Sequence, residues 1–252
     1  MKDLTIDFFT NVKGKRILIT GGTTGIGRAT AELLVALGSR VLILGRDEQD
    51  FNSAFEEIKG RYPEGELYGS PADVTSKEDM VMIFGMAEKC MGGIDILVNN
   101  AALPANGITN DAYDEIKYVI DTNIMGYLAF AREAVARMSL QGSGHIVNIG
   151  SMSAEVREES GTVYVATKEA IRGFTAALRK EVNPLGIKVS LVEPGAVTSD
   201  MQPGTKEEHR EKIEKMEMLE SQDIAMSILF CLCQPKRCDI VSLQVRPHLQ
   251  II

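Results

Sequence analysis

The first 45 residues constrain the fold most strongly, because two kinds of apolar pattern alternate around a glycine-rich turn. The run Arg16–Thr20 (RILIT) is short and largely apolar, as a strand buried on both faces requires. It leads directly into the turn Gly21–Gly27 (GGTTGIG), and the next run, Arg28–Leu37, has apolar residues at helical spacing. A second apolar run, Arg40–Leu44, follows. This order predicts a right-handed strand–helix–strand crossover unit.

The same alternation continues along the chain. Five further strands are predicted at Glu66–Ser70, Ile94–Val98, His145–Ile149, Lys188–Val192 and Ile240–Val245. Helices are predicted at Asp47–Lys59, Ser76–Met91, Ala112–Leu140 (one helix or two in tandem), Thr162–Asn183, Lys206–Glu220 and Ser221–Cys233. Seven strands with intervening helices predict an α/β fold, a Rossmann-like doubly wound and mostly parallel sheet with helices on both faces. No linker or repeat interrupts the pattern, so we expect one domain over residues 1–252.

Polar or glycine residues follow each of the first six predicted strands, where ligands bind in such sheets. These strand ends are the glycine turn, Gly45–Asp47, Ala72–Val74, Asn99–Ala102, Gly150–Ser151 and Glu193–Gly195. We therefore expect one crevice lined by six loops. In the glycine turn, Gly21, Gly25 and Gly27 have the spacing GxxxGxG, which leaves room for a pyrophosphate at a helix N-terminus.

Tyr164 and Lys168 lie four residues apart and share one helix face, which suggests an activated phenol. An ammonium about 4.5 Å away lowers the pKa of a phenol by roughly three units, which suits a general acid/base. Such pairs are also common on exposed helices, so the pair alone decides nothing. Ser151, at the mouth of the fifth strand, either holds a substrate oxygen or caps a turn. Asn123 is locally unfavourable in a helix interior, which indicates a buried hydrogen bond of structural or catalytic use.

Six motifs together resemble the short-chain dehydrogenase/reductase family over residues 15–198: TGGTTGIG, NNAA at Asn99–Ala102, Asn123, Ser151, YVATK at Tyr164–Lys168, and Glu193–Gly195. The resemblance implies Tyr164 as general acid/base, Lys168 as the cation that lowers its pKa and holds the nicotinamide ribose, Ser151 as the group that polarises the carbonyl, and Asn123 as the holder of a proton-relay water. It implies cofactor contacts from Gly21, Thr23, Thr24, Gly25, Ile26, Gly27, Asp73, Val74, Asn100, Ala101, Pro194, Gly195, Val197 and Thr198, besides Tyr164 and Lys168. It also implies pairing of the helices at 112–140 and 162–183 with a second copy, in a homodimer or homotetramer.

Two stretches depart from the family's pattern. Ala102 stands where the family usually has glycine, so the backbone there must tolerate a methyl group. The tail VSLQVRPHLQII replaces the family's glycine-rich ending, so contacts between subunits through that tail are in doubt. The charged segment at about 196–220 occupies the place of the family's substrate lid. We interpret its helix as amphipathic, with Ile213, Met216 and Leu219 facing inward.

The second strand's end bears on the choice of nicotinamide cofactor. An acid there would bind ribose hydroxyls and repel a 2′-phosphate, but this chain has Gly45 followed by Arg46. Arginine can hold a phosphate through two parallel hydrogen bonds. Thr24 is neutral where a second base is common in NADP-dependent relatives, and Asp47 adds an opposing charge. We favour NADP(H), with NAD(H) as the alternative.

The overall composition excludes some classes of partner. The net charge of −8 argues against nucleic acid or an anionic membrane surface. The N-terminal residues show no secretory signal, and no run is long enough to cross a bilayer. Four cysteines, Cys90, Cys231, Cys233 and Cys238, lack histidine partners at zinc spacing, so we expect reduced thiols, no metal site and a cytoplasmic location.

The expected function is an oxidoreductase that acts on a small carbonyl or alcohol substrate. A cofactor-binding regulatory or interaction protein on the same fold is the main alternative. Sugar-nucleotide epimerase or dehydratase chemistry needs a substrate domain for which this chain is short.

Overall fold

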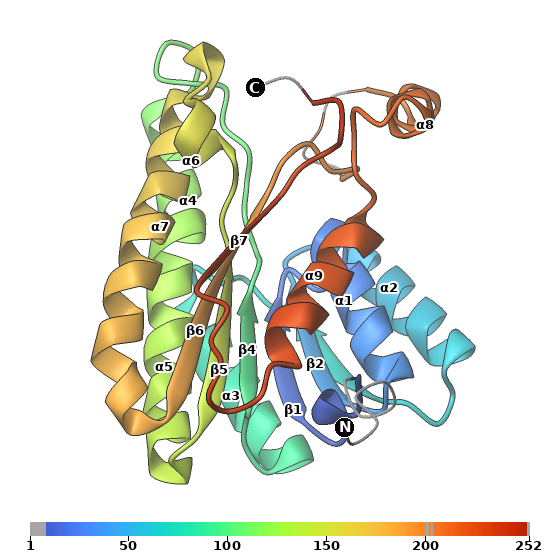
Figure 1. Ribbon diagram of the computed structural model, residues 1–252, viewed down its shortest axis with the longest axis vertical. Helices are drawn as coiled ribbons and strands as arrows, with labels where there is room; N and C mark the ends of the chain where they lie inside the picture. The colour runs from blue at the N-terminus through green and yellow to red at the C-terminus, as the bar shows by residue number, and fades with distance from the viewer. Residues whose placement is uncertain (1–8, 200–201, 203, 251–252) are drawn as a thin grey trace.

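The computed structural model of this chain describes residues 9–199, 202 and 204–250. Seven parallel strands form one sheet in the order β3-β2-β1-β4-β5-β6-β7 (Figure 1). The strands are β1 (Arg16–Thr20), β2 (Arg40–Gly45), β3 (Glu66–Pro71), β4 (Ile96–Asn99), β5 (Gly144–Ile149), β6 (Ile187–Pro194) and β7 (Ser242–Val245). The predicted fold class is therefore confirmed.

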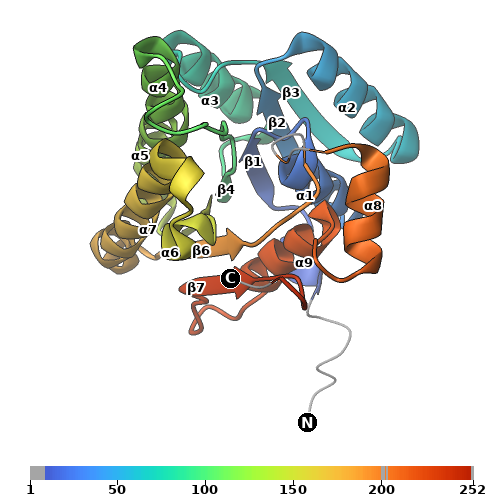
Figure 2. The same ribbon diagram turned by 90° about the horizontal axis from the view of Figure 1, so that it is seen from above.

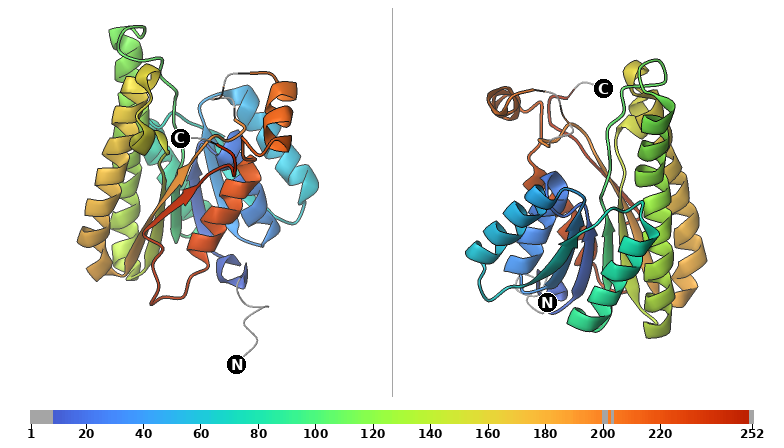
Figure 3. Two further views of the ribbon diagram at one scale, coloured as in Figure 1. Left: turned by 45° about the horizontal axis from the view of Figure 1, so that its top comes forward. Right: turned by 180° about the vertical axis from the view of Figure 1, so that it is seen from behind.

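Helices cover both faces of this sheet (Figure 3). One face carries α1 (Gly25–Ala36), α2 (Glu48–Arg61) and α9 (Ser221–Leu232). The other carries α3 (Lys77–Met91), α4 (Tyr113–Ile120), α5 (Tyr127–Gln141) and α7 (Thr162–Val182). Side chains alternate along a strand, so Ile17 and Ile19 of β1 enter the core under α1 and α9 while Leu18 enters the opposite core.

The long helical segment between β4 and β5 is continuous but changes its winding. Between α4 and α5, residues Asp121–Gly126 form a π-helical segment that contains Asn123. Such wide turns frequently occur at functional sites. The prediction of one helix or two in tandem thus corresponds to two helices joined without a break.

The substrate-lid segment differs from its prediction. Its helix, α8, covers only Lys206–Glu214 and contains no buried residue. Met216, expected to face inward, is 52% exposed and has a left-handed backbone (φ 58°), which ends any helix. Leu219 does pack against the core, because its backbone pairs with Ala196 and Thr198 instead of continuing a helix.

The loops that follow the strands gather at one end of the molecule. Figure 2 looks down onto this end, with α8 on one side and the short helix α6 (Ser153–Val156), which sequence patterns missed, on the other. The described part of the tail, up to Gln250, runs back to the same end (Figure 1). The remaining helical turns are short: Phe9–Val12, Glu159–Gly161 and Asn183–Leu185.

The cysteines are all free thiols. Cys231, on α9, and Cys233, directly after α9, are buried in the core. Burial raises the pKa of Cys231 to about 12 and that of Cys233 to about 11. Among the described residues, no helix is both long and apolar enough to span a bilayer. The secretory-signal prediction rests mostly on residues 1–8, which lie outside the described part.

Candidate active site

Two adjoining cavities lie beyond the carboxyl ends of the strands. They share five lining residues, so they are two halves of one crevice: Ile26, Asn100, Ala102, Pro104 and Ser199. The first half is lined by Ser151, Tyr164 and Lys168, and the second by the glycine turn and Arg46. This position is the one expected for a ligand of an open parallel sheet.

Five residues of the glycine turn line the second half of the crevice: Gly21, Thr23, Thr24, Gly25 and Ile26. Gly27 lines neither half. Gly21 has φ +62°, a conformation that glycine adopts readily. A Cβ at Gly27 would lie 2.0 Å from the Gly21 carbonyl oxygen, so only glycine lets α1 start this close to β1. Helix α1 begins at Gly25, and its first N–H groups have no partner within the helix. The turn therefore leaves room and donors for a pyrophosphate.

Asn100 fastens the glycine turn to the end of β4. Its side-chain amide donates to the carbonyl oxygens of Thr20 (3.0 Å) and Gly21 (2.9 Å). The Thr20 hydroxyl accepts from the backbone N–H groups of Asn100 (2.9 Å) and Ala101 (3.1 Å). Ala102 lines both halves of the crevice and does not have a positive φ, so the backbone accommodates its methyl group.

At the outer end of the second half, Arg46, Tyr118 and Asp73 form a hydrogen-bonded chain. The Arg46 guanidinium donates to the Tyr118 hydroxyl (2.9 Å), which donates to the Asp73 carboxylate (2.6 Å). The hydrogen bond to Tyr118 raises the pKa of Arg46. Burial tends to raise the pKa of Asp73, but hydrogen bonds from Tyr118 and Thr75 outweigh it and lower the pKa. Val74 lines the same region.

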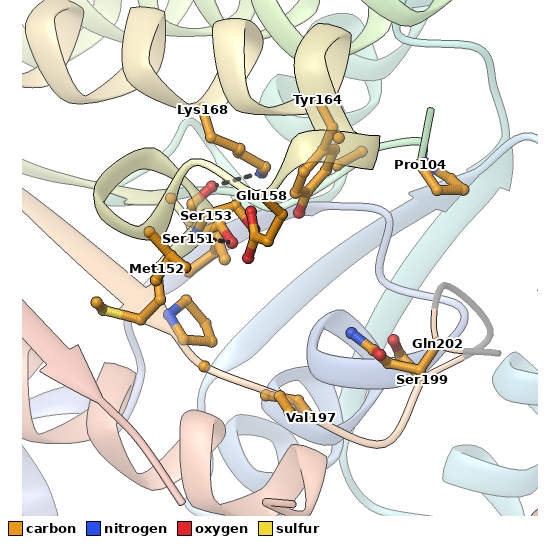
Figure 4. A pocket seen from close by; sticks show the side chains of 18 of the residues that line it. Pro104, Ser151, Met152, Ser153, Glu158, Tyr164, Lys168, Val197, Ser199 and Gln202 are labelled. Carbon is orange, nitrogen blue, oxygen red and sulfur yellow. Dashed lines mark hydrogen bonds between the residues drawn. The ribbon is translucent and has the colours of Figure 1, made fainter. Parts of the chain in front are cut away.

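The first half of the crevice brings together the three residues expected to carry chemistry. Figure 4 shows Tyr164 and Lys168 projecting from α7 towards Ser151 on the loop after β5, with Glu158 beside them. The Lys168 ammonium lies 5.5 Å from the centre of the Tyr164 ring and donates to the Ile149 carbonyl oxygen at 3.0 Å. Ser151 Oγ accepts a hydrogen bond from the Ser153 N–H (3.1 Å). Ser151 therefore caps a turn and also lines the crevice, while its contact with a substrate oxygen stays a prediction.

The expected acidification of the phenol is wrong for the protein alone. Tyr164 has some surface in the crevice, but its hydroxyl is largely surrounded by protein, and this desolvation raises its pKa to about 12. A hydrogen bond with Ser151 lowers this pKa, while the charge of Glu158 raises it. The same burial lowers the pKa of Lys168 to about 8. Coulomb arithmetic from the spacing omitted the desolvation, which is the larger effect here.

Asn123 lies outside the crevice lining and is completely buried. Its side-chain oxygen accepts from the Leu103 N–H (2.8 Å), and its amide group donates to the Leu103 carbonyl (2.9 Å) and Thr167 Oγ1 (3.2 Å). These contacts tie the π-helical segment to the loop after β4 and to α7. They are the buried hydrogen bonds expected from its sequence position, while its role towards a water molecule stays a prediction.

Pro194, Gly195 and Val197 line the opposite wall of the first half, and their contact with a nicotinamide stays a prediction. Thr198 lines neither half. Its N–H donates to the Leu219 carbonyl (2.9 Å), and it borders a separate hollow against α8. The backbone pairing of the lid thus turns Thr198 away, and Ser199 reaches the crevice instead.

The tail contributes to this wall. Gln250 lines the first half, and its side-chain oxygen accepts from the Ala196 N–H (3.1 Å). The Leu249 N–H donates to the Met216 carbonyl (2.9 Å), and the Gly195 N–H donates to the Val245 carbonyl (2.8 Å). The described tail therefore holds both ends of the lid segment within its own chain.

The comparisons with known proteins decide the family. Residues 15–210 match the family model described as short chain dehydrogenase. The chain belongs to the short-chain dehydrogenase family. An uncharacterized oxidoreductase of Staphylococcus aureus (strain USA300) is 34% identical over 239 residues, 94% of this chain and 99% of that protein. One from Staphylococcus epidermidis is 33% identical over 237 residues, 94% and 98% of the two chains.

Solved short-chain dehydrogenases share the architecture. A 3-ketoacyl-(acyl-carrier-protein) reductase from Brucella melitensis complexed with NADH is 25% identical, with a TM-score of 0.82 over 95% of this chain and 100% of that one. A short chain dehydrogenase from Burkholderia cenocepacia in complex with NADP is 26% identical, with a TM-score of 0.82 over 94% and 98%. As a member of this family, the chain is an oxidoreductase.

Besides Ser199, sequence reasoning missed Tyr118, Tyr127, Glu158 and Gln250 at this short-chain dehydrogenase site. Tyr127 is buried, and its hydroxyl donates to the same Ile149 carbonyl as Lys168 (3.1 Å). The centre of its ring lies 5.6 Å from the Lys168 ammonium. Its spacing of four residues from Asn123 on the helical segment was the one available signal. The other three reach the crevice only through the tertiary fold.

Proposed function

We propose that this chain is an NADP(H)-dependent oxidoreductase that interconverts a carbonyl compound and a secondary alcohol, with Tyr164 as general acid/base. The observation that carries the proposal is the convergence of Ser151, Tyr164 and Lys168 on one cavity that continues into the glycine turn. The proposal treats residues 1–252 as one cofactor-binding domain with a lid over about 196–220.

The residues present fit a nicotinamide dinucleotide. A side chain at Gly21 or Gly27 would collide with backbone, so the turn keeps a bare concave surface beside the N-terminus of α1. Asn100 and Ala101 supply a floor, and Asp73 and Val74 border the place for adenine. Lys168, Pro194, Gly195 and Val197 surround the other half. When bound, the nicotinamide would supply or accept the hydride.

The chain's own residues would manage the substrate oxygen and its proton. In reduction, Tyr164 Oη donates its proton to that oxygen, and in oxidation it takes the proton back. Ser151 Oγ hydrogen-bonds the same oxygen and polarises the carbonyl. With the cofactor bound, the Lys168 ammonium would donate to the ribose hydroxyls and, as a nearby cation, would favour the phenolate form of Tyr164 against the desolvation that raises its pKa. Asn123 keeps the loop after β4 and α7 in register beneath this set.

Three observations favour NADP(H) over NAD(H). β2 ends in Gly45 rather than in the acid that would hold ribose hydroxyls, and a Cβ there would lie 2.4 Å from Thr23 Oγ1, so an acid at this position would require the Thr23 side chain to move. Asp47 caps α2 by accepting from the Asp50 N–H (2.9 Å), which commits one of its oxygens to the helix. Arg46 then supplies the cation at the rim of the crevice. The solved relatives contain one cofactor or the other, so this preference rests on the residues.

The acid/base role is tested by Tyr164→Phe, with Tyr113→Phe as the matched control because Tyr113 is 79% exposed on α4. We expect Tyr164→Phe to lower the turnover of a carbonyl panel by about 100-fold or more while NADPH binding persists. The Tyr113→Phe control should keep both its turnover and its NADPH binding. Near-normal turnover of Tyr164→Phe with bound NADPH would remove the proposed role. NADPH binding by the wild type without turnover would instead favour the regulatory alternative.

The proposal includes a cytoplasmic homo-oligomer with a small-molecule substrate. Large apolar side chains remain exposed on α4 and the π-helical segment, among them Ile120 and Met125. They support pairing of this region with a second copy. The free thiols support a reducing compartment.

A further inference from the structure

The chain Arg46–Tyr118–Asp73 places an aromatic hydroxyl between a cation and an anion at the outer end of the crevice. The three residues come from different elements: Arg46 follows β2, Asp73 follows β3, and Tyr118 lies in the last turn of α4. All three line the half of the crevice that contains the glycine turn. The guanidinium carbon of Arg46 also lies 5.4 Å from the centre of the Tyr118 ring, within reach of a cation–π contact.

Tyr118 is itself held in place from behind. Its hydroxyl donates to Asp73 Oδ2, while Asp73 Oδ1 accepts from the N–H and the hydroxyl of Thr75, both at 2.8 Å. The carboxylate is therefore fixed by three hydrogen bonds and in turn fixes the phenol. With its proton committed to Asp73, the Tyr118 oxygen has only acceptor capacity left for Arg46.

This arrangement restricts the conformations of the Arg46 side chain at the rim of the crevice. An arginine side chain on an exposed loop samples many rotamers, and holding it for a ligand costs conformational entropy. One N–H group of Arg46 is anchored to Tyr118, which leaves its other donors for a ligand anion. The phenol also stands between Arg46 and Asp73, so the nearby carboxylate is hydrogen-bonded to Tyr118 and Thr75.

We infer that Tyr118 is a positioning residue that orients Arg46 for the 2′-phosphate of NADP(H) and so sets the preference for the phosphorylated cofactor. This inference rests on the proposed function, because it assumes that Arg46 meets the 2′-phosphate. It adds a residue on α4 to a preference that the sequence places only at the end of β2.

The inference is tested by nucleotide binding, without turnover. Dissociation constants of NADP⁺ and NAD⁺ are measured by calorimetry for the wild type, Tyr118→Phe, Arg46→Ala and the double variant. Phenylalanine keeps the ring but removes the hydroxyl. Tyr113→Phe on the same helix is the matched control, and thermal melting checks that each variant is folded.

We expect Tyr118→Phe to weaken NADP⁺ binding about fivefold to tenfold, as for loss of one hydrogen-bonded anchor, and NAD⁺ binding less than about twofold. In the Arg46→Ala background, Tyr118→Phe should leave the NADP⁺/NAD⁺ ratio unchanged, because the group it orients is gone.

The set of variants separates the inference about Tyr118 from the proposed preference for NADP(H). If Arg46→Ala removes the preference but Tyr118→Phe leaves the ratio as in the wild type, or weakens both nucleotides equally, the inference is overturned and the proposed cofactor stands. The inference also fails if Tyr118→Phe still changes the ratio without Arg46. If the wild type shows no preference, or Arg46→Ala does not reduce it, both the cofactor proposal and the inference are overturned.

Discussion

Replacing Lys168 by methionine isolates the energetic consequence of keeping a cation at the floor of the crevice. Lys168 is 2% exposed, and its only hydrogen bond among the described residues goes to the Ile149 carbonyl. Burial disfavours the charged form, so the pKa of this ammonium falls from 10.5 to about 8 in the folded protein. Methionine has a similar length and no charge, so it removes the titration while filling much of the same space.

The sign of the effect follows from where the proton binds more tightly. The unfolded chain holds the Lys168 proton more strongly than the folded protein, so the wild type's free energy of unfolding should rise between pH 8 and 10.5. At pH 7 the cost of burying the Lys168 charge lowers the free energy of unfolding almost in full, and at pH 10 most of this cost has gone. The pKa values give a change of about 2.5 kcal/mol between these two pH values. The variant has no such titration. The free energy of unfolding of the variant minus that of the wild type should therefore fall by this amount between pH 7 and pH 10.

The assay is urea unfolding of both proteins at pH 7 and at pH 10, with the free energy compared at each pH. Lys89→Met, a change at an exposed lysine of α3, controls for the loss of a positive charge. Packing and the lost hydrogen bond shift the gap between variant and wild type equally at both pH values, so the change in the gap reports the buried charge. A gap that does not change with pH, or that changes as much in the Lys89 control, would refute the reasoning.

Three further substitutions test other parts of the structure. Burial lowers the pKa of His145 to about 4, so its protonation at low pH favours the unfolded chain. Between pH 7.5 and 4.5 the free energy of unfolding should fall by about 2.5 kcal/mol more in the wild type than in His145→Gln. Equal losses in urea titrations would contradict this. Gly27→Ala should destabilise the protein by about 1–3 kcal/mol and lower its melting temperature, because its Cβ meets the Gly21 carbonyl, whereas Gly60→Ala, with open space around it, should not. Gln250→Ala should speed deuterium exchange at the Ala196 amide by roughly tenfold, and unchanged exchange would exclude the tail as its partner.

The fold was largely predictable because strongly periodic segments decide it. The β1–β2 unit and the helices between the later strands have apolar patterns that tertiary contacts reinforce. The lid was the weak point. Ile213, Met216 and Leu219 have helical spacing, but α8 ends at Glu214 before the left-handed Met216, and the backbone of Leu219 pairs with Ala196 and Thr198 instead. Long-range backbone pairing of this kind leaves no periodic trace in the sequence.

The candidate site was predictable where the strand ends determine it and unpredictable where burial does. The loops after six strands lead to Arg46, Asn100 and Ser151, and all three line the crevice. Desolvation of the Tyr164 hydroxyl depends on every element packed around it, so sequence spacing gave the wrong direction for its pKa. Tyr118 lies 45 residues after Asp73, and only the path of α4 brings the two together.

A crystal structure of the protein with NADPH bound tests the central claim most directly. The account predicts the nicotinamide in the half of the crevice lined by Ser151, Tyr164 and Lys168, with the Tyr164 hydroxyl facing its reactive edge and the 2′-phosphate on Arg46. A nicotinamide outside that cavity, or a Tyr164 hydroxyl directed away from it, would contradict the account.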